Sequence, residues 1–363
     1  MSKLKITGEE RILIIRTDRI GDLVLSTPVL EAIRSRFPKV HVTMMVSPYA
    51  ADVLNDNPYL NQVMMDDVQY RHKGVKGFFL LVREVRQGKF DVGILLRPTL
   101  RLALMLFLAG VKYRIGTGFR FYQIFLNRKV YVHRKVNLKH EVEYNMDLIT
   151  PLGIVSTKIL PKVYVTSAEE EYVRKTFDEL NITPEDIVVV IHPGSGKSSL
   201  NLPAKRFAEV ADELIEKMGA KVVFTGLNNE KNTVEFIKSK MRFNPIDLTG
   251  KTTIPQLKAV LKKCDVLISN STGPMHLACA LGTPTVAIFC PIFAAGPVRW
   301  GPYGEGNQVI LPPVPVCFKC RPNKCPHYDC MEKIKTEQIV SKVSLLLKTK
   351  IDFKHSHQHI KRA

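Results

Sequence analysis

The sequence predicts an α/β protein made of two doubly wound domains. Short apolar, β-branched runs typical of strands alternate with segments of helical periodicity, and the same alternation restarts in the second half of the chain. Strands this uniformly apolar are buried on both faces, as in a parallel sheet covered by helices on both sides. A length of 363 residues is sufficient for two such domains.

In the first half, a strand at residues 11–16 is followed by the loop TDRIGD and a helical pattern at 22–37 that Pro38 closes. Further strands are expected at 40–46, 62–67 and 90–96, and further helices at 49–55 and 99–109. These segments form the βαβ units of a first domain, residues 1–160.

The segment STKILPKVYVTS, residues 156–167, lacks helical periodicity and is expected to be an interdomain linker. Strands of a second domain, residues 161–345, are expected at 187–194, 220–226, 244–250, 264–270 and 283–289. The polar, basic residues 346–363 are expected to be a frayed tail.

The composition indicates an anionic partner and a reducing compartment. The formal charge of +19 suits phosphate, nucleic acid or an anionic membrane surface, and charge alone does not choose among them. The seven cysteines do not resemble the framework of a secreted disulfide-rich domain. The first residues form no apolar signal segment, and the longest apolar stretch, residues 102–111, is about half of a membrane span. A soluble cytoplasmic chain is therefore expected.

Asp22 is the first candidate for a chemical role. In TDRIGD, Gly21 permits a tight turn, and Asp22 follows at the carboxyl edge of the first strand, where a carboxylate can act as a general base. The alternative is that Asp22 only caps the next helix, since Asp is a preferred residue at that position.

Two later segments have the composition of anion sites. In HPGSGKSSLNLPAKRF, Ser195, Gly196 and Lys205 offer hydroxyl, amide and cation, although the glycine spacing is not that of a P-loop. The alternative is a Gly-rich turn with solvated lysines. In SNSTGPMHLACALG, Ser271 and Thr272 precede a helix whose N-terminus suits a diphosphate; the alternative is a simple capping turn.

The cysteines Cys317, Cys320, Cys325 and Cys330 are spaced closely enough to hold a structural zinc ion. Their spacing is tighter than that of common zinc ribbons, so free thiols are an equal alternative. The other three cysteines fall within expected strands or helices and are interpreted as core residues.

Four stretches in order resemble glycosyltransferase family 9, the ADP-heptose:lipopolysaccharide heptosyltransferases. These stretches are IIRTDRIGDLVLSTPVLEAIRSRFP, HPGSGKSSLNLPAKRF, DLTGKTTIPQLKAVLKKCDVLISNSTGPMHLACALGTPTVAIF and RWGPYG. The resemblance implies a GT-B fold, with two Rossmann-like domains facing across a cleft. It implies that the first domain binds the acceptor and that the second binds the nucleotide sugar. It also implies inverting transfer and no catalytic metal ion, which leaves the structural zinc as the one metal considered.

Within this resemblance, Asp22 matches the catalytic carboxylate of the GD motif. Lys205 in AKRF matches a phosphate-contacting lysine, and Glu230 in TGLNNE resembles the acidic residue that contacts the nucleotide ribose.

Thr272, Gly273 and His276 match the TGxxH segment that faces the diphosphate. Ser271 stands where characterised relatives tend to have Asp, so the contact to the donor sugar is expected to differ. On the acceptor side, the resemblance places Arg71, Lys73 and Arg128 against the anionic acceptor.

The expected function is transfer of a heptose or related sugar from an ADP-sugar to an anionic glycolipid, the lipopolysaccharide core. The enzyme is expected at the inner face of the cytoplasmic membrane, where cations attract anionic lipids. One alternative is another GT-B nucleotide-sugar enzyme, with a different donor sugar or an epimerase activity. A nucleic-acid-binding protein is a second alternative, disfavoured because the sequence has no recognised motif of that class and a single Trp.

Overall fold

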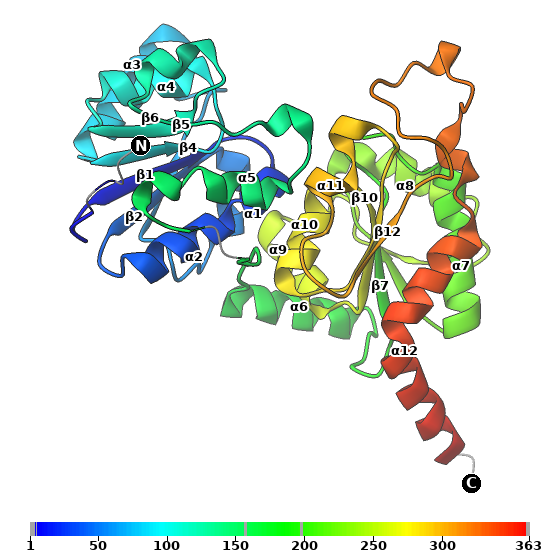
Figure 1. Cartoon of the computed structure of the whole chain (residues 1–363). Helices are drawn as coiled ribbons and strands as arrows, with labels where there is room; N and C mark the ends of the chain where they lie inside the picture. Colours follow the sequence, from blue (N-terminus) through cyan, green and yellow to red (C-terminus); the bar gives the residue numbers. More distant parts are fainter. Residues whose placement is uncertain (1–3, 5, 156–157, 197–198, 361–363) are drawn as a thin grey trace. The chain divides into compact units, whose positions relative to one another are not determined.

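The computed structural model describes residue 4 and residues 6–155, 158–196 and 199–360, the last twelve by their backbone only. The chain divides into two compact units, Met1–Tyr164 and Val165–Ala363, so the boundary falls within the segment expected to be a linker. Each unit contains a parallel six-stranded sheet with helices on both faces (Figure 1). The predicted α/β class with two doubly wound units is confirmed.

The sheet of unit 1 has the strand order β3-β2-β1-β4-β5-β6. Its strands are β1 (Arg11–Arg16), β2 (His41–Val46), β3 (Gln62–Met65), β4 (Val92–Leu95), β5 (Tyr113–Thr117) and β6 (Arg128–Val130). Its helices are α1 (Ile20–Val24), α2 (Thr27–Arg36), α3 (Gly74–Gln87), α4 (Leu100–Leu108) and α5 (Glu141–Asp147), with short 3-10 helices η1 (Pro48–Leu54), η2 (Phe121–Phe125), η3 (Arg134–Val136) and η4 (Thr150–Leu152).

Alternate residues of β1 pack on opposite faces of this sheet. Leu13 and Ile15 join a core cluster with side chains of α3 and α4, and the intervening Ile12 and Ile14 are equally buried. Figure 1 shows α3 and α4 on one face and α2 on the other. Burial on both faces explains why β1 is apolar throughout and not alternating.

The sheet of unit 2 has the order β12-β11-β10-β7-β8-β9. Its strands are β7 (Val188–His192), β8 (Lys221–Phe224), β9 (Ile246–Asp247), β10 (Val266–Asn270), β11 (Thr285–Ile288) and β12 (Asn307–Ile310). Its helices are α6 (Ser167–Glu179), α7 (Ala204–Met218), α8 (Lys231–Lys238), α9 (Ile254–Lys263), α10 (Gly273–Leu281), α11 (Pro297–Trp300) and α12 (Thr336–Ile360), with 3-10 helices η5 (Asn228–Glu230), η6 (Phe293–Ala295), η7 (Pro322–Lys324) and η8 (Cys330–Lys333).

The C-terminal segment differs from the expectation of a frayed tail. Residues 346–360 continue α12, which begins at Thr336. The segment contains neither Gly nor Pro, so nothing in it terminates the helix that the preceding apolar residues begin.

The helix expected at 22–37 is also different, because it is divided into α1 and α2. Leu25 and Ser26 separate the two, and Pro28 lies in the first turn of α2, where a missing amide hydrogen costs no helical hydrogen bond.

Over the described ranges, none of the helices has both the length and the apolar character needed to cross a bilayer.

Candidate active site

In unit 1 the order of the strands reverses between β1 and β4. The chain leaves β1 towards β2 on one side and leaves β4 towards β5 on the other. Ligands of doubly wound sheets bind at the carboxyl ends of the strands beside such a reversal. Asp22 lies there, in the helix α1 that directly follows β1.

Asp22 is not the cap of its helix. Helix α1 begins at Ile20, and Arg19 occupies the N-cap position without a side-chain capping bond. Asp22 therefore lies in the first turn, where a negative charge interacts favourably with the helix dipole. The alternative that Asp22 only caps the helix is therefore wrong, because the N-cap is Arg19. The side chain of Asp22 makes another interaction.

That interaction is an ion pair with the buried guanidinium of Arg16, the last residue of β1. Arg16 donates through Nη2 to Asp22, through Nε to Asp18 at 2.8 Å and through Nη1 to Glu141 at 3.0 Å. The side chains of Arg16 and Glu141 are 3% and 1% exposed. One arginine thus positions three carboxylates at the carboxyl end of β1.

The same network determines how strongly Asp22 holds a proton. Burial raises the pKa of Asp22, Arg16 lowers it, and the carboxylates of Asp18 and Glu141 raise it again, so that the pKa lies above its ordinary value. The pKa of Arg16 is also raised, because its three carboxylate neighbours outweigh its burial. A carboxylate with a raised pKa is a stronger base than an exposed aspartate.

The sequence patterns did not identify the residues that support Asp22. Arg16 is only the end of the strand expected at residues 11–16, and no pattern in the sequence singles out Glu141 or Asn145. Asn145 is fully buried, accepts a hydrogen bond from Arg16 at 3.2 Å and donates to the carbonyl of Leu25 at 3.0 Å. A charged residue at the end of a buried strand was the available signal, since such a charge needs a partner.

In unit 2 the strand order reverses between β7 and β10. Asn270, the last residue of β10, connects the two sides of this reversal. Its amide donates to the carbonyl of Pro193 at 2.6 Å, and its carbonyl oxygen accepts from the backbone of Leu202 at 3.0 Å. Asn270 therefore positions both ends of the loop that follows β7.

His192 and Glu230 lie together at the carboxyl ends of β7 and β8. His192 Nδ1 lies 3.1 Å from the hydroxyl of Thr225, and its Nε2 lies 3.8 Å from a carboxylate oxygen of Glu230. Burial lowers the pKa of His192 even though Glu230 opposes this shift, so the imidazole is neutral. A Cβ on Gly194 would lie 1.8 Å from the Glu230 carboxylate, so this glycine is needed for the close approach.

The other residues predicted to bind the donor follow the same strands. Lys205 lies in the first turn of α7 with its side chain 77% exposed, and its ammonium is 4.0 Å from Glu209. Ser195 is buried and donates to the carbonyl of Ser199 at 3.4 Å. The structure therefore places Ser195 and Lys205 after β7, which pairs with β10, and Glu230 after β8, on the other side of β7.

Residues 271–276 follow β10 directly. Thr272 is the N-cap of α10, and its side chain makes no capping bond, whereas Gly273 is the first helical residue. The backbone amide of Ser271 donates to Ile288 of the neighbouring strand at 3.0 Å, and His276 is buried within the helix. The N-terminus of α10 thus lies at the reversal point, as predicted for a diphosphate-binding segment.

The three basic residues predicted on the acceptor side are not placed together. Arg71 and Lys73 lie in the loop between β3 and α3, whereas Arg128 begins β6; β3 and β6 are the two edge strands. Strand pairing through β5 and β4 places Arg128 level with Ile14, in the middle of β1 and not at its carboxyl end.

The contacts of these arginines are also local. The Arg128 guanidinium stacks 5.3 Å from the Tyr113 ring centre. Arg71 forms an ion pair with Glu84 of α3. Their contacts thus do not bring Arg71 and Arg128 together, and their role against the acceptor stays a prediction.

The four clustered cysteines were considered as a zinc site. In the described part of the chain, which includes all four, no group of three or more His, Cys, Asp or Glu side chains is placed so that it could hold a metal ion. All seven cysteines are free thiols. The structural zinc ion that their spacing suggested stays a prediction.

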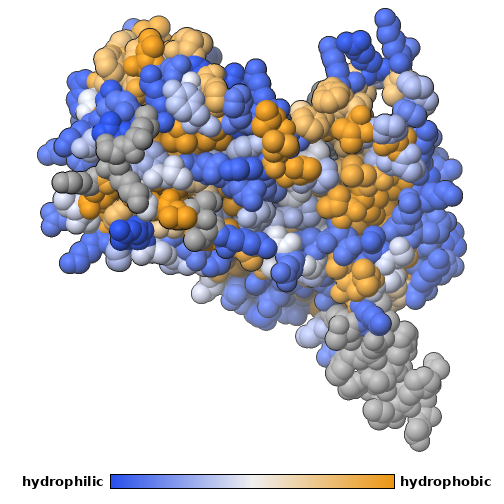
Figure 2. Space-filling view, viewed as in Figure 1, coloured by the Kyte–Doolittle hydropathy of each residue, from blue (hydrophilic) through white to orange (hydrophobic). Residues whose placement is uncertain are grey.

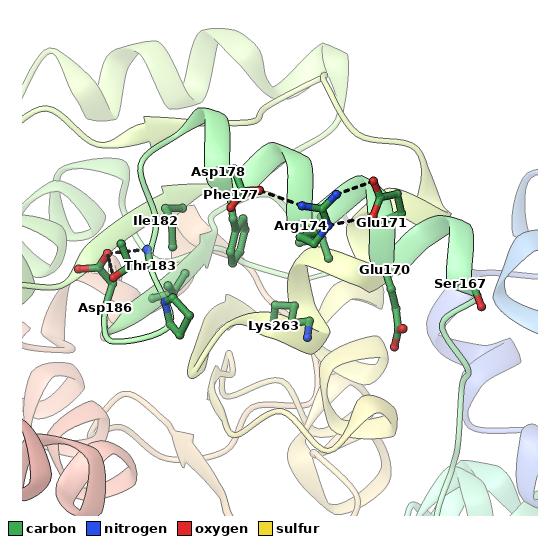
Figure 3. A pocket seen from close by; sticks show the side chains of 13 residues that line it. Ser167, Glu170, Glu171, Arg174, Phe177, Asp178, Ile182, Thr183, Asp186 and Lys263 are labelled. Carbon is green, nitrogen blue, oxygen red and sulfur yellow. Dashed lines mark hydrogen bonds and ion pairs between the residues drawn. The ribbon is translucent and has the colours of Figure 1, made fainter.

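A cavity of about 500 Å³ lies elsewhere in unit 2 (Figure 3). It is lined by α6, by the loop before β7 and by Lys263 at the end of α9. Its loop precedes β7, and Lys263 precedes β10, so the cavity lies at the amino ends of these strands. Ligands of doubly wound sheets bind at the opposite edge, and we do not assign the donor to this cavity.

The chain is similar to known proteins in sequence and in fold. The sequence model described as glycosyltransferase family 9 (heptosyltransferase) matches residues 78–331. The lipopolysaccharide core heptosyltransferase OpsX of Haemophilus influenzae is 24% identical over 303 residues, 82% of this chain and 83% of that protein.

Two solved structures share the fold. A family 9 glycosyl transferase from Veillonella parvula has a TM-score of 0.85 at 24% identity, covering 96% of this chain and all of that one. The ADP-heptose lps heptosyltransferase II of Escherichia coli has a TM-score of 0.74 at 20% identity, covering 94% and 99%.

Proposed function

The chain belongs to glycosyltransferase family 9, and from this premise we propose that it transfers a heptose from ADP-heptose to the lipopolysaccharide core, with inversion at the anomeric carbon. The names of two relatives support the substrates: one is a lipopolysaccharide core heptosyltransferase and the other an ADP-heptose heptosyltransferase. The same acceptor implies work at the inner face of the cytoplasmic membrane.

Asp22 is the general base of this reaction. The acceptor hydroxyl attacks the anomeric carbon from the face opposite the diphosphate, its proton passes to Asp22, and the bond between the sugar and ADP breaks. The observation that carries this assignment is the ion pair with buried Arg16 at the carboxyl end of β1. Arg16 fixes the direction of the carboxylate, while burial and two neighbouring carboxylates raise the pKa of Asp22.

The diphosphate of the donor is stabilised by Lys205 and by the backbone amides of Thr272 and Gly273 at the start of α10. Lys205 supplies an exposed ammonium, and the helix N-terminus supplies orphan N–H groups and a positive dipole end. Glu230 accepts hydrogen bonds from the ribose, whereas half-buried Ser271 and buried His276 belong to the diphosphate-binding segment at the start of α10. These groups offset the charge that develops on the leaving ADP.

We propose that this charge is balanced without a divalent cation. Activity is then expected to be unchanged in EDTA and unaffected by added Mg²⁺. A loss in EDTA that Mg²⁺ restores would contradict this part of the mechanism.

We further propose that Arg71, Lys73 and Arg128 bind the anionic acceptor. Arg71 and Lys73 are exposed and precede α3, so they can reach an anionic substituent of the acceptor. Replacement of either by Ala is expected to raise the acceptor KM and leave ADP affinity unchanged. Replacement of Arg128, which stacks on Tyr113, is expected to change the acceptor KM less.

The test of Asp22 compares two variants of the same network. Asp22→Asn keeps a hydrogen-bond acceptor for Arg16 but cannot take a proton, so kcat should fall by roughly 10²- to 10⁴-fold while ADP affinity is kept. Asp18→Asn is the matched variant, because it removes a second carboxylate that Arg16 binds, at 2.8 Å. If both variants lose activity equally, Asp22 only balances the charge of Arg16 and is not the base.

The test of the donor site uses two lysines of α7. Lys205→Ala should weaken ADP binding by about tenfold or more, because a charge-assisted contact is lost. Lys217→Ala, in the last turn of the same helix, removes a lysine paired with Glu213 and should leave ADP binding unchanged. Equal affinities of the two variants, measured by calorimetry, would remove Lys205 from the donor site.

A further inference from the structure

Helix α4 has an outward face that is apolar. Leu102, Ala103, Met105 and Leu106 are buried against the sheet of unit 1. On the opposite side, Leu100 and Phe107 are 42% and 48% exposed, with Leu104 between them at helical spacing. A helix that covers a sheet in water normally carries polar residues at these positions. The outward face of α4 is thus built for an apolar environment.

The neighbouring elements extend this face. Helix α4 packs against both α3 and η2. Val75 and Phe79, one turn apart on α3, are largely exposed, and so are Phe121 and Ile124 of η2. Figure 2 shows apolar colour gathered over the part of unit 1 where Figure 1 places α3 and α4. We name the α3–α4–η2 surface by its apolar residues: Val75, Phe79, Leu100, Leu104, Phe107, Phe121 and Ile124.

Cations surround this surface. Lys76, Arg83 and Arg86 of α3 are exposed, as are Lys112 between α4 and β5 and Arg120 directly before η2. Between Asp67 and His140 the chain holds 16 Lys and Arg and only two acidic residues, a net +14 of the total +19. The charge surplus of the whole protein is therefore concentrated in the segment that forms this surface.

Arginines also contact the aromatic rings of the surface directly. The Arg114 guanidinium lies 5.4 Å from the ring centre of Phe107, and Arg114 Nε donates to the carbonyl of Phe125 at 2.7 Å. The rings of Phe107 and Phe125 are 5.5 Å apart, which links α4 to η2. These contacts make the surface a continuous layer of apolar and cationic side chains.

We propose that the α3–α4–η2 surface docks the protein onto a bilayer containing anionic lipids. Exposed aromatic and aliphatic side chains enter the boundary of the acyl chains, while the surrounding Lys and Arg contact lipid phosphates. Charge complementarity selects the anionic bilayer, and the aliphatic Val75, Leu100 and Ile124 distinguish it from a nucleic acid, which offers no apolar layer to them.

The position of the surface connects it to the candidate site. Helix α4 follows β4 and begins at Leu100, and η2 follows β5 and begins at Phe121. Both helices therefore begin at the carboxyl edge of the sheet, where Asp22 lies after β1. An acceptor anchored in the bilayer would reach the site at this edge. This last step rests on the proposed function, whereas docking itself does not.

The experiment measures co-sedimentation of the full-length protein with vesicles of phosphatidylcholine, alone or with phosphatidylglycerol. Wild-type protein should bind the anionic vesicles and be released by high salt. Phe107→Ser with Ile124→Ser should reduce the affinity at least tenfold, and Lys76→Gln with Arg83→Gln roughly fivefold for each charge removed. Phe236→Ser, at a half-exposed aromatic of α8 in unit 2, is the control and should bind as wild type.

Several results would overturn the proposal. These are absence of vesicle binding by the wild type, equal binding by the surface variants, and equal loss in the Phe236 variant. A wild-type dimer that dissociates in the Phe107, Ile124 variant would assign the surface to a second copy of the chain. RNA binding in place of vesicle binding would assign it to nucleic acid. Transfer to a soluble acceptor fragment is measured separately, so its failure would count against the proposed function and leave docking intact.

Discussion

Replacement of Arg16 by Met should separate the structural and chemical roles of the network around Asp22. Met has a similar length and no charge, so the variant removes the guanidinium without leaving a large void. Asp22 then has no ion pair among the described residues, and Glu141, which is 1% exposed, keeps its ion pair with Arg134, whose Nε lies 3.3 Å away. The three carboxylates that Arg16 binds thus lose the guanidinium that they share.

The loss of the Arg16 guanidinium should lower the free energy of unfolding. Breaking a buried ion pair by removing one partner destabilises a protein by about 3–5 kcal/mol. For a unit of the size of Met1–Tyr164, each kcal/mol lowers the melting temperature by about 2–4 °C. The melting temperature of unit 1 should therefore fall by roughly 6–20 °C at pH 7.

The loss should depend on pH in a defined direction. Without Arg16, which lowers the pKa of Asp22, this pKa lies further above its ordinary value in the folded state. The folded variant then binds more protons than the unfolded chain, so its stability falls as the pH rises. The acidic limb of its pH–rate profile should move to higher pH, because Asp22 must be ionised to act as a base.

Thermal unfolding and pH–rate profiles between pH 5 and 8 measure both effects. Arg34→Met is the control, because Arg34 donates to the carbonyls of Pro38 and Val40 and its loss should not depend on pH. An Arg16 variant as stable as the wild type, or one whose stability loss is independent of pH, would refute the network as described.

Three further predictions concern stability and nucleotide binding. Asp22→Asn should be at least as stable as the wild type at pH 7, because the raised pKa of Asp22 means that its ionised carboxyl destabilises the fold there. This difference in stability should vanish as the pH falls towards 3.8, the ordinary pKa of the side chain. An Asp22→Asn variant less stable than the wild type at pH 7 would contradict this. Gly194→Ala should displace Glu230 and weaken ADP binding by about tenfold, with no further loss when Glu230→Ala is added; additive losses in the double variant would refute the contact. Lys258→Ala should cost about 3–5 kcal/mol in urea unfolding, because Lys258 is fully buried 3.1 Å from Glu169, and wild-type stability would show that the pair is not buried in solution.

The sequence by itself was sufficient to predict the layers of the fold and one side of the chemistry. Apolar runs such as that of β1, separated by helical segments, permit few arrangements other than a parallel sheet covered on both faces. The carboxyl edge of such a sheet is also predictable, so Asp22, Lys205 and Thr272 could be placed there from their positions after strands. Elements with weaker patterns were missed, among them α3 and the short edge strand β6.

Only the tertiary structure decided which charges meet. Arg16 and Glu141 are 125 residues apart in sequence, and their ion pair depends on the packing of α5 near the end of β1. Arg128 shows the converse, because strand register places it in the middle of the sheet, away from Asp22. The exposed apolar face of α4 was likewise hidden, since periodicity cannot tell a helix that is buried all round from one with an uncovered side. Periodicity is a local property of the chain, whereas burial and the pairing of charges depend on contacts between distant segments.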